Sequence, residues 1–204
     1  MRDYIFFEKK DTKKAVFIDR DGTINIDTVM PHKKSDYMLF KDCIEALTII
    51  SRLNVYLFIV TNQSGIALGK YKSSDMSNFN KLVLDDLVKH GIVLNGVYYC
   101  PHLDEKNIPV GQSVCGCSKP MPGLLFEALN DFDINLKDSI IIGDKPSDVG
   151  AGINAGIENT ILVTTGIYKH GDYTKERYAD KYQPKYVVPN LLQAANVVRD
   201  IVTT

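Results

Sequence analysis

The sequence predicts an α/β fold, a doubly wound parallel sheet with helices on both faces. Short runs that are apolar throughout alternate with segments whose apolar residues recur at helical spacing. Strands that helices cover on both faces have this continuous apolar character. A length of 204 residues is typical of one domain, so we expect residues 1–204 to form a single domain.

The chain up to Val60 contains two predicted strands and one predicted helix. Ala15–Ile18 is apolar throughout and ends at an acidic turn. Asp42–Leu53 carries apolar residues every three or four positions, which predicts a helix. Val55–Val60 is a second apolar run, and polar residues from Thr61 onward end it.

A long helix and a third strand follow. We expect the helix over Ser74–His90, with Ser74 as its N-cap and Gly91 as its stop signal. Its buried face is expected to consist of Phe79, Leu82, Val83, Leu87 and Val88. Val97–Tyr99 is the third strand.

The alternating pattern returns after Cys100–Pro122, an irregular stretch rich in Pro, Gly and Cys. The remaining predicted elements are a helix at Gly123–Phe132, a strand at Ser139–Ile142, a helix at Asp148–Ala155, strands at Thr160–Val163 and Lys185–Val188, and a helix at Leu191–Val202.

Charge and hydropathy exclude several classes of partner. The chain has 24 Lys and Arg against 25 Asp and Glu, a formal charge of −1, so no basic face for nucleic acid is expected. The apolar runs are too short to cross a bilayer. Residues 1–14 are charged and lack the apolar stretch of a signal peptide. We therefore expect a cytoplasmic protein that binds neither nucleic acid nor membrane.

Two carboxylates, Asp19 and Asp21, stand directly after the first strand, and Gly22 allows the sharp turn that follows. In a parallel sheet, the carboxyl ends of the strands border the ligand crevice. One carboxylate of such a pair can attack while the other moves a proton. An acidic turn without chemistry remains an alternative for this pattern taken alone.

Polar residues at other strand ends favour phosphoryl transfer. Asp144 adds a carboxylate, and converging carboxylates repel one another unless a divalent cation such as Mg²⁺ lies between them. Thr61 and Asn62 offer donors to a phosphate, and Lys119 adds a positive charge. Such a set can position and neutralise a transferring phosphoryl group.

In this order the motifs resemble those of the haloacid-dehalogenase superfamily of phosphatases, over about Ala15 to Val202. They are D-x-D-G-T at Asp19, T-N at Thr61, Lys119-Pro120 and G-D-x-x-x-D at Gly143. Within the superfamily the sequence is most similar to its heptose bisphosphate phosphatases. The strings that carry this similarity are Asp19–Asn25, Thr61–Ala67, Tyr98–His102 and Gly143–Lys145.

The resemblance implies a Rossmann-like core with a minimal cap, and a role for each site residue. Asp19 is the implied nucleophile, which forms an aspartyl-phosphate, and Asp21 is the implied general acid and then base. The Asp19 carboxylate, the Asp21 carbonyl and Asp144 are the implied Mg²⁺ ligands. Asp148 anchors Lys119 or the metal's waters. The implied phosphate and substrate ligands are Thr61, Asn62, Gln63, Ser64, Lys119 and Lys145.

The implied substrate is a small phosphosugar, such as a heptose 1,7-bisphosphate that loses its 7-phosphate during synthesis of a surface-glycan precursor. Histidinol-phosphate phosphatases share the paired aspartates and are the nearest alternative. They typically have Asn-Gln-Asp-Gly where this chain has Asn62-Gln63-Ser64-Gly65. A phosphosugar phosphatase of shifted specificity, a catalytically inactive binding protein and a mutase are further alternatives. Mutases of the superfamily usually have a larger cap. We expect a monomer or a small homo-oligomer.

Three cysteines and one histidine form a second motif. Cys100, His102, Cys115 and Cys117 offer three sulfurs and one imidazole, which is a closed set typical of a structural Zn²⁺ site. The loop has few apolar residues, so a metal can supply its cross-link. Scattered buried thiols or a disulfide remain alternatives. Cys43 is expected in the core, and His32, His90 and His170 at the surface or in loops.

Three departures from the family pattern bear on substrate. Leu68 and Ser118 stand where the family has Arg, and Val29-Met30-Pro31 stands where it has Gly-Tyr-Val. A lost Arg removes a bidentate phosphate contact that Lys cannot replace, and Lys70 or Arg20 is a candidate to compensate for the lost charge. We therefore expect the reaction to be retained and the leaving group to differ.

Overall fold

The computed structural model describes residues 1–3, 12–104, 107–109, 115–166 and 173–204. Part of the zinc loop (residues 100–117), most of the charged segment 1–14 and His170 lie outside these residues. None of the helices in the described ranges has both the length and the apolar character needed to cross a membrane.

In the part of the chain that the structure describes, seven strands form one sheet, and all of them except the first run parallel, which confirms the predicted fold class. Their order across the sheet is β1-β4-β3-β2-β5-β6-β7. The strands are β1 Arg2–Asp3, β2 Ala15–Ile18, β3 Tyr56–Asn62, β4 Gly96–Cys100, β5 Ile140–Gly143, β6 Asn159–Val163 and β7 Tyr186–Val188. The three strands that precede the acidic and Thr-Asn motifs, β3, β2 and β5, are therefore neighbours at the centre.

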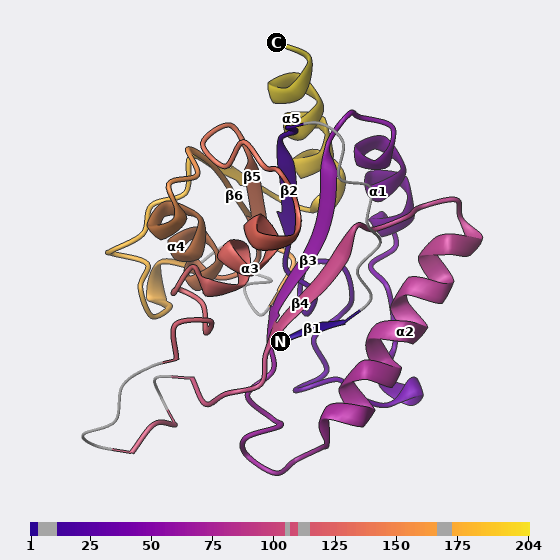
Figure 1. Ribbon diagram of the computed structural model, residues 1–204, viewed down its shortest axis with the longest axis vertical. Coiled ribbons are helices and arrows are strands. Elements are labelled where there is room, and N and C mark those ends of the chain that lie inside the picture. The colour runs from indigo at the N-terminus through magenta and orange to yellow at the C-terminus, as the bar shows by residue number, and fades with distance from the viewer. Residues whose placement is uncertain (4–11, 105–106, 110–114, 167–172) are drawn as a thin grey trace.

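Within the described residues, five α-helices cover the two faces of this sheet, as can be followed in Figure 1. They are α1 Cys43–Ser51, α2 Ser73–Lys89, α3 Gly123–Asp131, α4 Pro146–Ala155 and α5 Leu191–Thr203. Helices α1, α2 and α5 pack on one face, and α3 and α4 pack on the other. Between β2 and α1 lies only a short 3₁₀ helix, η1 Lys34–Asp36, so the cap is minimal. A second 3₁₀ helix, η2, spans Tyr173–Lys175.

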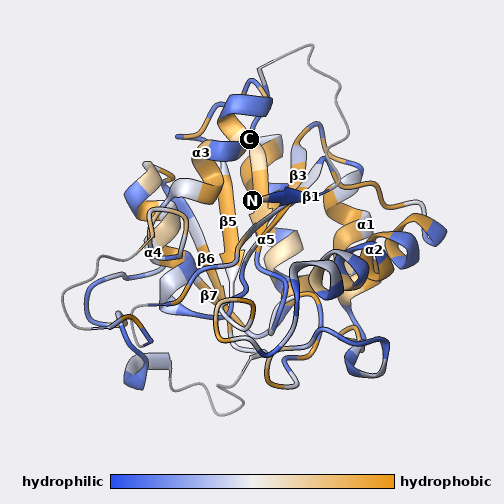
Figure 2. Cartoon of the chain, turned by 60° about the horizontal axis from the view of Figure 1, so that its bottom comes forward, coloured by the Kyte–Doolittle hydropathy of each residue, from blue (hydrophilic) through white to orange (hydrophobic). Residues whose placement is uncertain are grey.

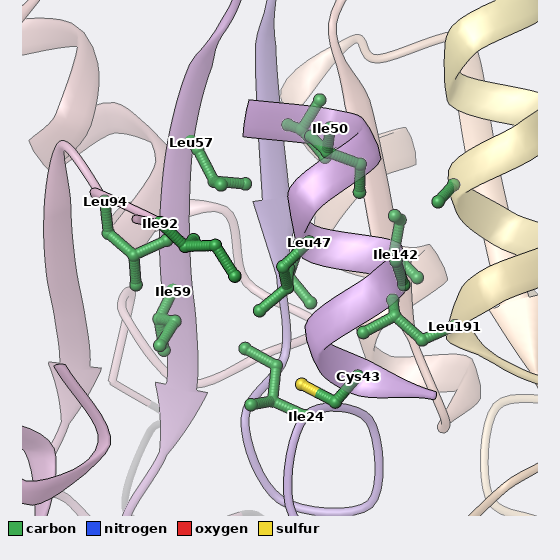
Figure 3. Packing of buried hydrophobic residues seen from close by; sticks show 14 of the residues in the cluster. Ile24, Cys43, Leu47, Ile50, Leu57, Ile59, Ile92, Leu94, Ile142 and Leu191 are labelled. Atoms are coloured by element: carbon green, nitrogen blue, oxygen red, sulfur yellow. The ribbon is translucent and has the colours of Figure 1, made fainter. Parts of the chain in front are cut away.

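Alternate residues of the strands point to opposite faces, and this divides the core in two. Val16 and Ile18 belong to the cluster under α1, while Ala15 and Phe17 belong to the cluster under α3. Figure 3 shows Leu47 and Ile50 of α1 over the sheet, together with the buried Cys43, as expected for that residue. Figure 2 shows the hydrophobic strands β5 and β6, and helices in which hydrophilic and hydrophobic residues alternate.

Aromatic rings fill the second face. The ring of Phe58 lies 5.0 Å from that of Phe132 and 5.4 Å from that of Phe17. Each such buried ring contributes about 1.5–3 kcal/mol through removal of apolar area from water. This packing fixes β2 and β3 relative to α3, and with them the polar residues that follow both strands.

Helix α2 differs from its prediction at its start and on its buried face. Ser74 is not the N-cap, because the helix begins at Ser73 and the amide of Lys72 donates to Asp75. Val88 is 55% exposed, and Leu82 is only partly buried. Met76, Asn80 and Leu84 are buried in addition to the three correctly predicted positions. The face is rotated because the polar Asn80 contacts a buried arginine, which apolar periodicity does not reveal.

Candidate active site

The carboxyl ends of β2, β3 and β5 bring the predicted site residues to one edge of the sheet. A cavity of about 110 Å³ lies there. Its walls include eight predicted site residues: Asp19, Asp21, Thr61, Asn62, Gln63, Ser64, Lys119 and Lys145. Asp144 is fully buried directly beneath this edge, at the end of β5. Residues separated by more than a hundred positions thus meet as the strand order requires.

Lys119 is the central cation of the site. Its ammonium group donates to Asp19 Oδ1 at 2.6 Å and to the Val60 carbonyl at 2.8 Å, and it also pairs with Asp148. Asn62 fixes the backbone here, since it accepts the Lys119 amide and donates to the Lys119 carbonyl. A buried ammonium needs such carboxylate partners to remain charged.

The pKa values of Asp19 and Lys119 are both raised above their usual values. Desolvation raises the pKa of Asp19 to about 6, and Lys119 opposes the shift while Asp148 adds to it. Burial lowers the pKa of Lys119, but Asp148 and Asp19 outweigh it and raise that pKa above its usual value. Lys119 is therefore positively charged at neutral pH and can neutralise a phosphoryl group beside Asp19.

Asp144 is the strongest indication of a cation site. Neither carboxylate oxygen accepts a hydrogen bond from any described residue, and the Lys145 ammonium lies 3.7 Å away. Burial raises the pKa of Asp144 well above its usual value. A buried carboxylate without donors is costly unless it is protonated or coordinates a cation. Asp19, Asp144 and Asp148 each place an oxygen within 4.8 Å of the others, a set that fits Mg²⁺.

Within this set Asp148 has other partners. One oxygen accepts the Lys145 amide at the start of α4 at 3.0 Å, and the other pairs with Lys119. Asp19 and Asp144 are therefore the better placed carboxylates to hold a cation. The Asp21 carboxylate is not part of this group, and its implied role as a metal ligand through the backbone carbonyl stays a prediction.

Asp21 is held by four hydrogen bonds. Arg20 donates to both of its oxygens, at 2.8 and 2.7 Å, and Gln63 and Asn25 donate at 2.8 and 3.0 Å. Burial opposes ionisation, but the charge and hydrogen bonds of Arg20 lower the pKa of Asp21 below its usual range. The carboxylate is thus ionised and orientated in the resting protein, which suits a base.

Arg20 is not available to substrate. Its side chain is fully buried, donates to Asn80 of α2 at 2.7 Å and lies over the Phe79 ring at 4.6 Å. The expectation that Arg20 replaces a lost substrate arginine is therefore wrong. The side chain instead donates hydrogen bonds to Asp21, because a buried guanidinium must find acceptors for its N–H groups within the fold.

Several residues that line the pocket were not predicted from the motifs. Tyr71 donates to Gln63 Oε1 at 2.7 Å, and Gln63 also donates to Thr61 Oγ1 at 2.8 Å. Asp27 pairs with Lys145 at 3.6 Å, and Met30 also lines the cavity. The departures from the family pattern would have pointed to Met30, whereas no sequence signal identified Tyr71 or Asp27.

The altered positions differ in exposure. Ser118 is buried and accepts a hydrogen bond from Asn62 at 3.3 Å, while Lys70 is exposed. Val29 and Met30 have φ values of 68° and 61°, in the left-handed region that glycine adopts freely. His32 is not a simple surface residue, since it is partly buried and stacks on Tyr71 with ring centroids 4.5 Å apart. His90 is exposed, as expected.

The cysteines and histidine of the second motif gather at the end of β4. Cys117 Sγ lies 2.9 Å from Cys115 Sγ, 3.0 Å from Cys100 Sγ and 3.4 Å from His102 Nδ1. All three thiols are free, so the disulfide alternative is wrong for this structure. Three sulfurs and one imidazole nitrogen around one point fit Zn²⁺ with no position left open.

Sequence relatives are phosphatases. Residues 116–194 match the HAD-hydrolase-like family. A protein of Pasteurella multocida, D-glycero-beta-D-manno-heptose-1,7-bisphosphate 7-phosphatase, is 38% identical over 82% of this chain and 94% of its own length. The D-glycero-alpha-D-manno-heptose-1,7-bisphosphate 7-phosphatase of Campylobacter jejuni is 40% identical over 80% of this chain and 89% of its own.

Solved structures show the same fold. A HAD-like phosphatase of Mesorhizobium loti aligns with a TM-score of 0.79 at 28% identity, over 99% of this chain and 92% of the other. The D,D-heptose 1,7-bisphosphate phosphatase of B. bronchiseptica, in complex with magnesium and phosphate, aligns with a TM-score of 0.77 at 23% identity, over 92% of this chain and 98% of the other.

Proposed function

Because the chain belongs to the haloacid-dehalogenase superfamily of phosphatases, we propose that it removes the 7-phosphate of D-glycero-D-manno-heptose 1,7-bisphosphate. The nucleophile is Asp19. This assignment rests on its position: Asp19 Oδ1 lies 2.6 Å from the Lys119 ammonium, and the neighbouring Asp144 carboxylate accepts no hydrogen bond from the described residues. Relatives of similar identity act on different anomers, so both anomers are substrates to be compared. The product serves the synthesis of a heptose-containing surface glycan.

Two steps complete the reaction. An oxygen of Asp19 attacks phosphorus and forms an aspartyl-phosphate, while the sugar oxygen leaves and takes a proton from Asp21. Asp21 then accepts a proton from water, and the resulting hydroxide attacks phosphorus and frees both Asp19 and inorganic phosphate. Since Arg20 keeps Asp21 ionised at rest, Asp21 must take up its first proton as substrate binds.

The other polar groups hold the phosphoryl group during both steps. The Lys119 ammonium is already at hydrogen-bond distance from Asp19, so it can contact the phosphoryl oxygens as they arrive. Thr61, Asn62, Ser64 and Lys145 border the same cavity. Magnesium, when held by Asp19, Asp144 and the Asp21 carbonyl, supplies positive charge that offsets the charge on the phosphoryl group.

Zinc has a structural part in this proposal. The four ligands close the loop that ends at Cys117, and Lys119 follows two residues later. A cross-linked loop therefore presents Lys119 to Asp19 in one position. The chain acts as one domain of residues 1–204, as a monomer or small homo-oligomer, in the cytoplasm, where free thiols remain reduced.

Phosphate release from both anomers of the heptose bisphosphate tests the proposal. Replacing Asp19 by Asn is expected to lower kcat/KM by about 10³-fold or more, because the nucleophile is lost. The exposed Asp85→Asn serves as the control for loss of one carboxylate and should retain full activity. Wild-type activity in the Asp19 variant, or faster hydrolysis of histidinol phosphate than of either heptose, would refute the proposal.

A further inference from the structure

A second hollow adjoins the catalytic cavity. It has a volume of about 430 Å³ and shares the Tyr71 wall with the cavity that contains Asp19. Its other walls come from His32 and Lys33 in the minimal cap, Lys70 before α2, and Asp75 and Asn78 in α2. The side chain of Tyr71 therefore borders both spaces.

The wall between the two spaces is rigidly held. Tyr71 donates its hydroxyl to the buried Gln63, and its ring stacks on His32. A side chain at Gly65 would collide with the Tyr71 ring, so the two are in close contact. The hollow is thus fixed in position relative to Asp21, which Gln63 also contacts.

Positive charge in the region is concentrated at the hollow. Lys119 and Lys145, the cations of the catalytic cavity, are each beside carboxylates. Lys33 and Lys70 are exposed, and neither ammonium forms an ion pair with any residue that the structure describes. The one carboxylate in the lining, that of Asp75, accepts the Lys72 amide at 2.8 Å. An anion in the hollow therefore meets two ammonium groups against one carboxylate, which is a net positive charge.

We propose that this hollow binds a phosphate group of the substrate other than the one that is transferred. The inference rests on the proposed function and specifies which end of a bisphosphorylated sugar it recognises. Lys33 and Lys70 then take the place of the arginines that Leu68 and Ser118 replace. Lysines act as point charges and not as bidentate forks, so recognition at this site is expected to weaken with salt.

Two substrates separate this subsite from the catalytic centre. D-glycero-D-manno-heptose 1,7-bisphosphate carries the second phosphate, and the 7-phosphate of the same sugar lacks it. In the K33A/K70A double variant we expect KM for the bisphosphate to rise about 10- to 100-fold with kcat nearly unchanged, as charged contacts of this kind predict. Kinetics with the monophosphate should be unaltered. The exposed Lys89→Ala, which removes an equivalent charge elsewhere, is the control.

Calorimetry with Asp19→Asn protein gives a second readout that does not need turnover. The bisphosphate should bind more tightly than the monophosphate, and K33A/K70A in the same background should abolish the difference, while K33R/K70R should retain it. An unchanged preference in the double variant overturns the subsite and leaves the proposed function intact. Absence of phosphatase activity in the wild type, with the binding preference still dependent on Lys33 and Lys70, overturns the function and retains the subsite.

Discussion

Val29 has a backbone conformation that glycine adopts far more easily than valine. Its φ is 68° and its side chain is 86% exposed, so no packing compensates for the strain. A β-branched residue in this region costs on the order of 1–3 kcal/mol, more than the roughly 0.5–1 kcal/mol of chain entropy that glycine adds to the unfolded state. We therefore expect Val29→Gly to raise the free energy of unfolding by about 1 kcal/mol.

Thermal unfolding measures this effect, which corresponds to a rise in Tm of about 2–4 °C for a chain of this size. The exposed Val93 does not have a positive φ and supplies the control. Val93→Gly should lower Tm, whereas a fall in Tm for Val29→Gly would show that the left-handed conformation is not strained.

Asp144 sets a pH dependence of stability. Its pKa is raised in the folded protein, so folding retains a proton that the unfolded chain releases above its ordinary pKa near 4. The contribution of Asp144 to the stability of the metal-free protein is therefore greatest below that value and is lost as pH rises above it. Asp19, with its pKa raised to about 6, adds to the same loss between about pH 4 and 6.

The corresponding prediction concerns Asp144→Asn in metal-free protein. The amide removes the cost of a buried charge, so Tm at pH 7.5 should rise by about 2–4 °C, or roughly 1 kcal/mol. In the wild type Mg²⁺ should raise Tm more at pH 7.5 than at pH 5, because binding needs deprotonated ligands. The variant should lose both that Mg²⁺ effect and activity, and a Mg²⁺ shift that persists would place the ion elsewhere.

Single residues show where sequence reasoning stops. Asp19 and Lys119 were predictable because a strand end and a motif fix their positions. The orientation of Arg20 was not, since it depends on Asn80, which lies sixty positions away on a helix whose buried face was predicted incompletely. Tyr71 belongs to no motif, although it lines the cavity and donates a hydrogen bond to Gln63.

The zinc loop connects the cluster of cysteines and histidine at the end of β4 to Lys119 in the active site. Its last ligand, Cys117, is followed by Ser118 and Lys119, both of which bond to Asn62 at the end of β3. Cys117→Ser is expected to reduce bound zinc from one ion per chain to none and to lower kcat/KM by about 10-fold or more, as misplacement of a phosphate-binding group does. Elemental analysis and phosphate release provide the two readouts.

Cys43→Ala is the matched control, because this thiol lies in the core beneath α1 and not in the loop. It should retain one zinc per chain and near-normal kcat/KM. Full activity in zinc-free Cys117→Ser protein would show that the loop does not position Lys119.

Most elements could be predicted because apolar runs and helical periodicity identify them directly. Strand β1 could not, since its two residues form no pattern and it exists only through pairing with β4. An ion pair between Arg2 and Asp131 of α3 fastens it at the edge of the sheet. The start of α2 was misplaced by one residue because a carboxylate at Asp75, and not a serine, caps the Lys72 amide.

At the scale of the whole molecule, the order of the strands determines where the site residues meet. Placing β2 between β3 and β5 gathers the three motif-bearing strand ends, and this convergence was predictable from the general behaviour of parallel sheets. The hollow beside Tyr71 was not predictable, because a net charge of −1 says nothing of where lysines cluster. Lys33 and Lys70 follow no common strand and meet only through the packing of the cap against α2.

The central claim is that this fold makes Asp19 a nucleophile that is phosphorylated and then released. Mass spectrometry tests it most directly on wild-type protein that is quenched with acid during turnover, because Asp21 serves both steps and only the intact site forms the intermediate at its full rate. After mixing with the heptose bisphosphate and Mg²⁺, the account predicts a single phosphoryl group, on the peptide that contains Asp19, and none without Mg²⁺. A phosphoryl group on another residue, or phosphate release undiminished by Asp19→Asn, would contradict it.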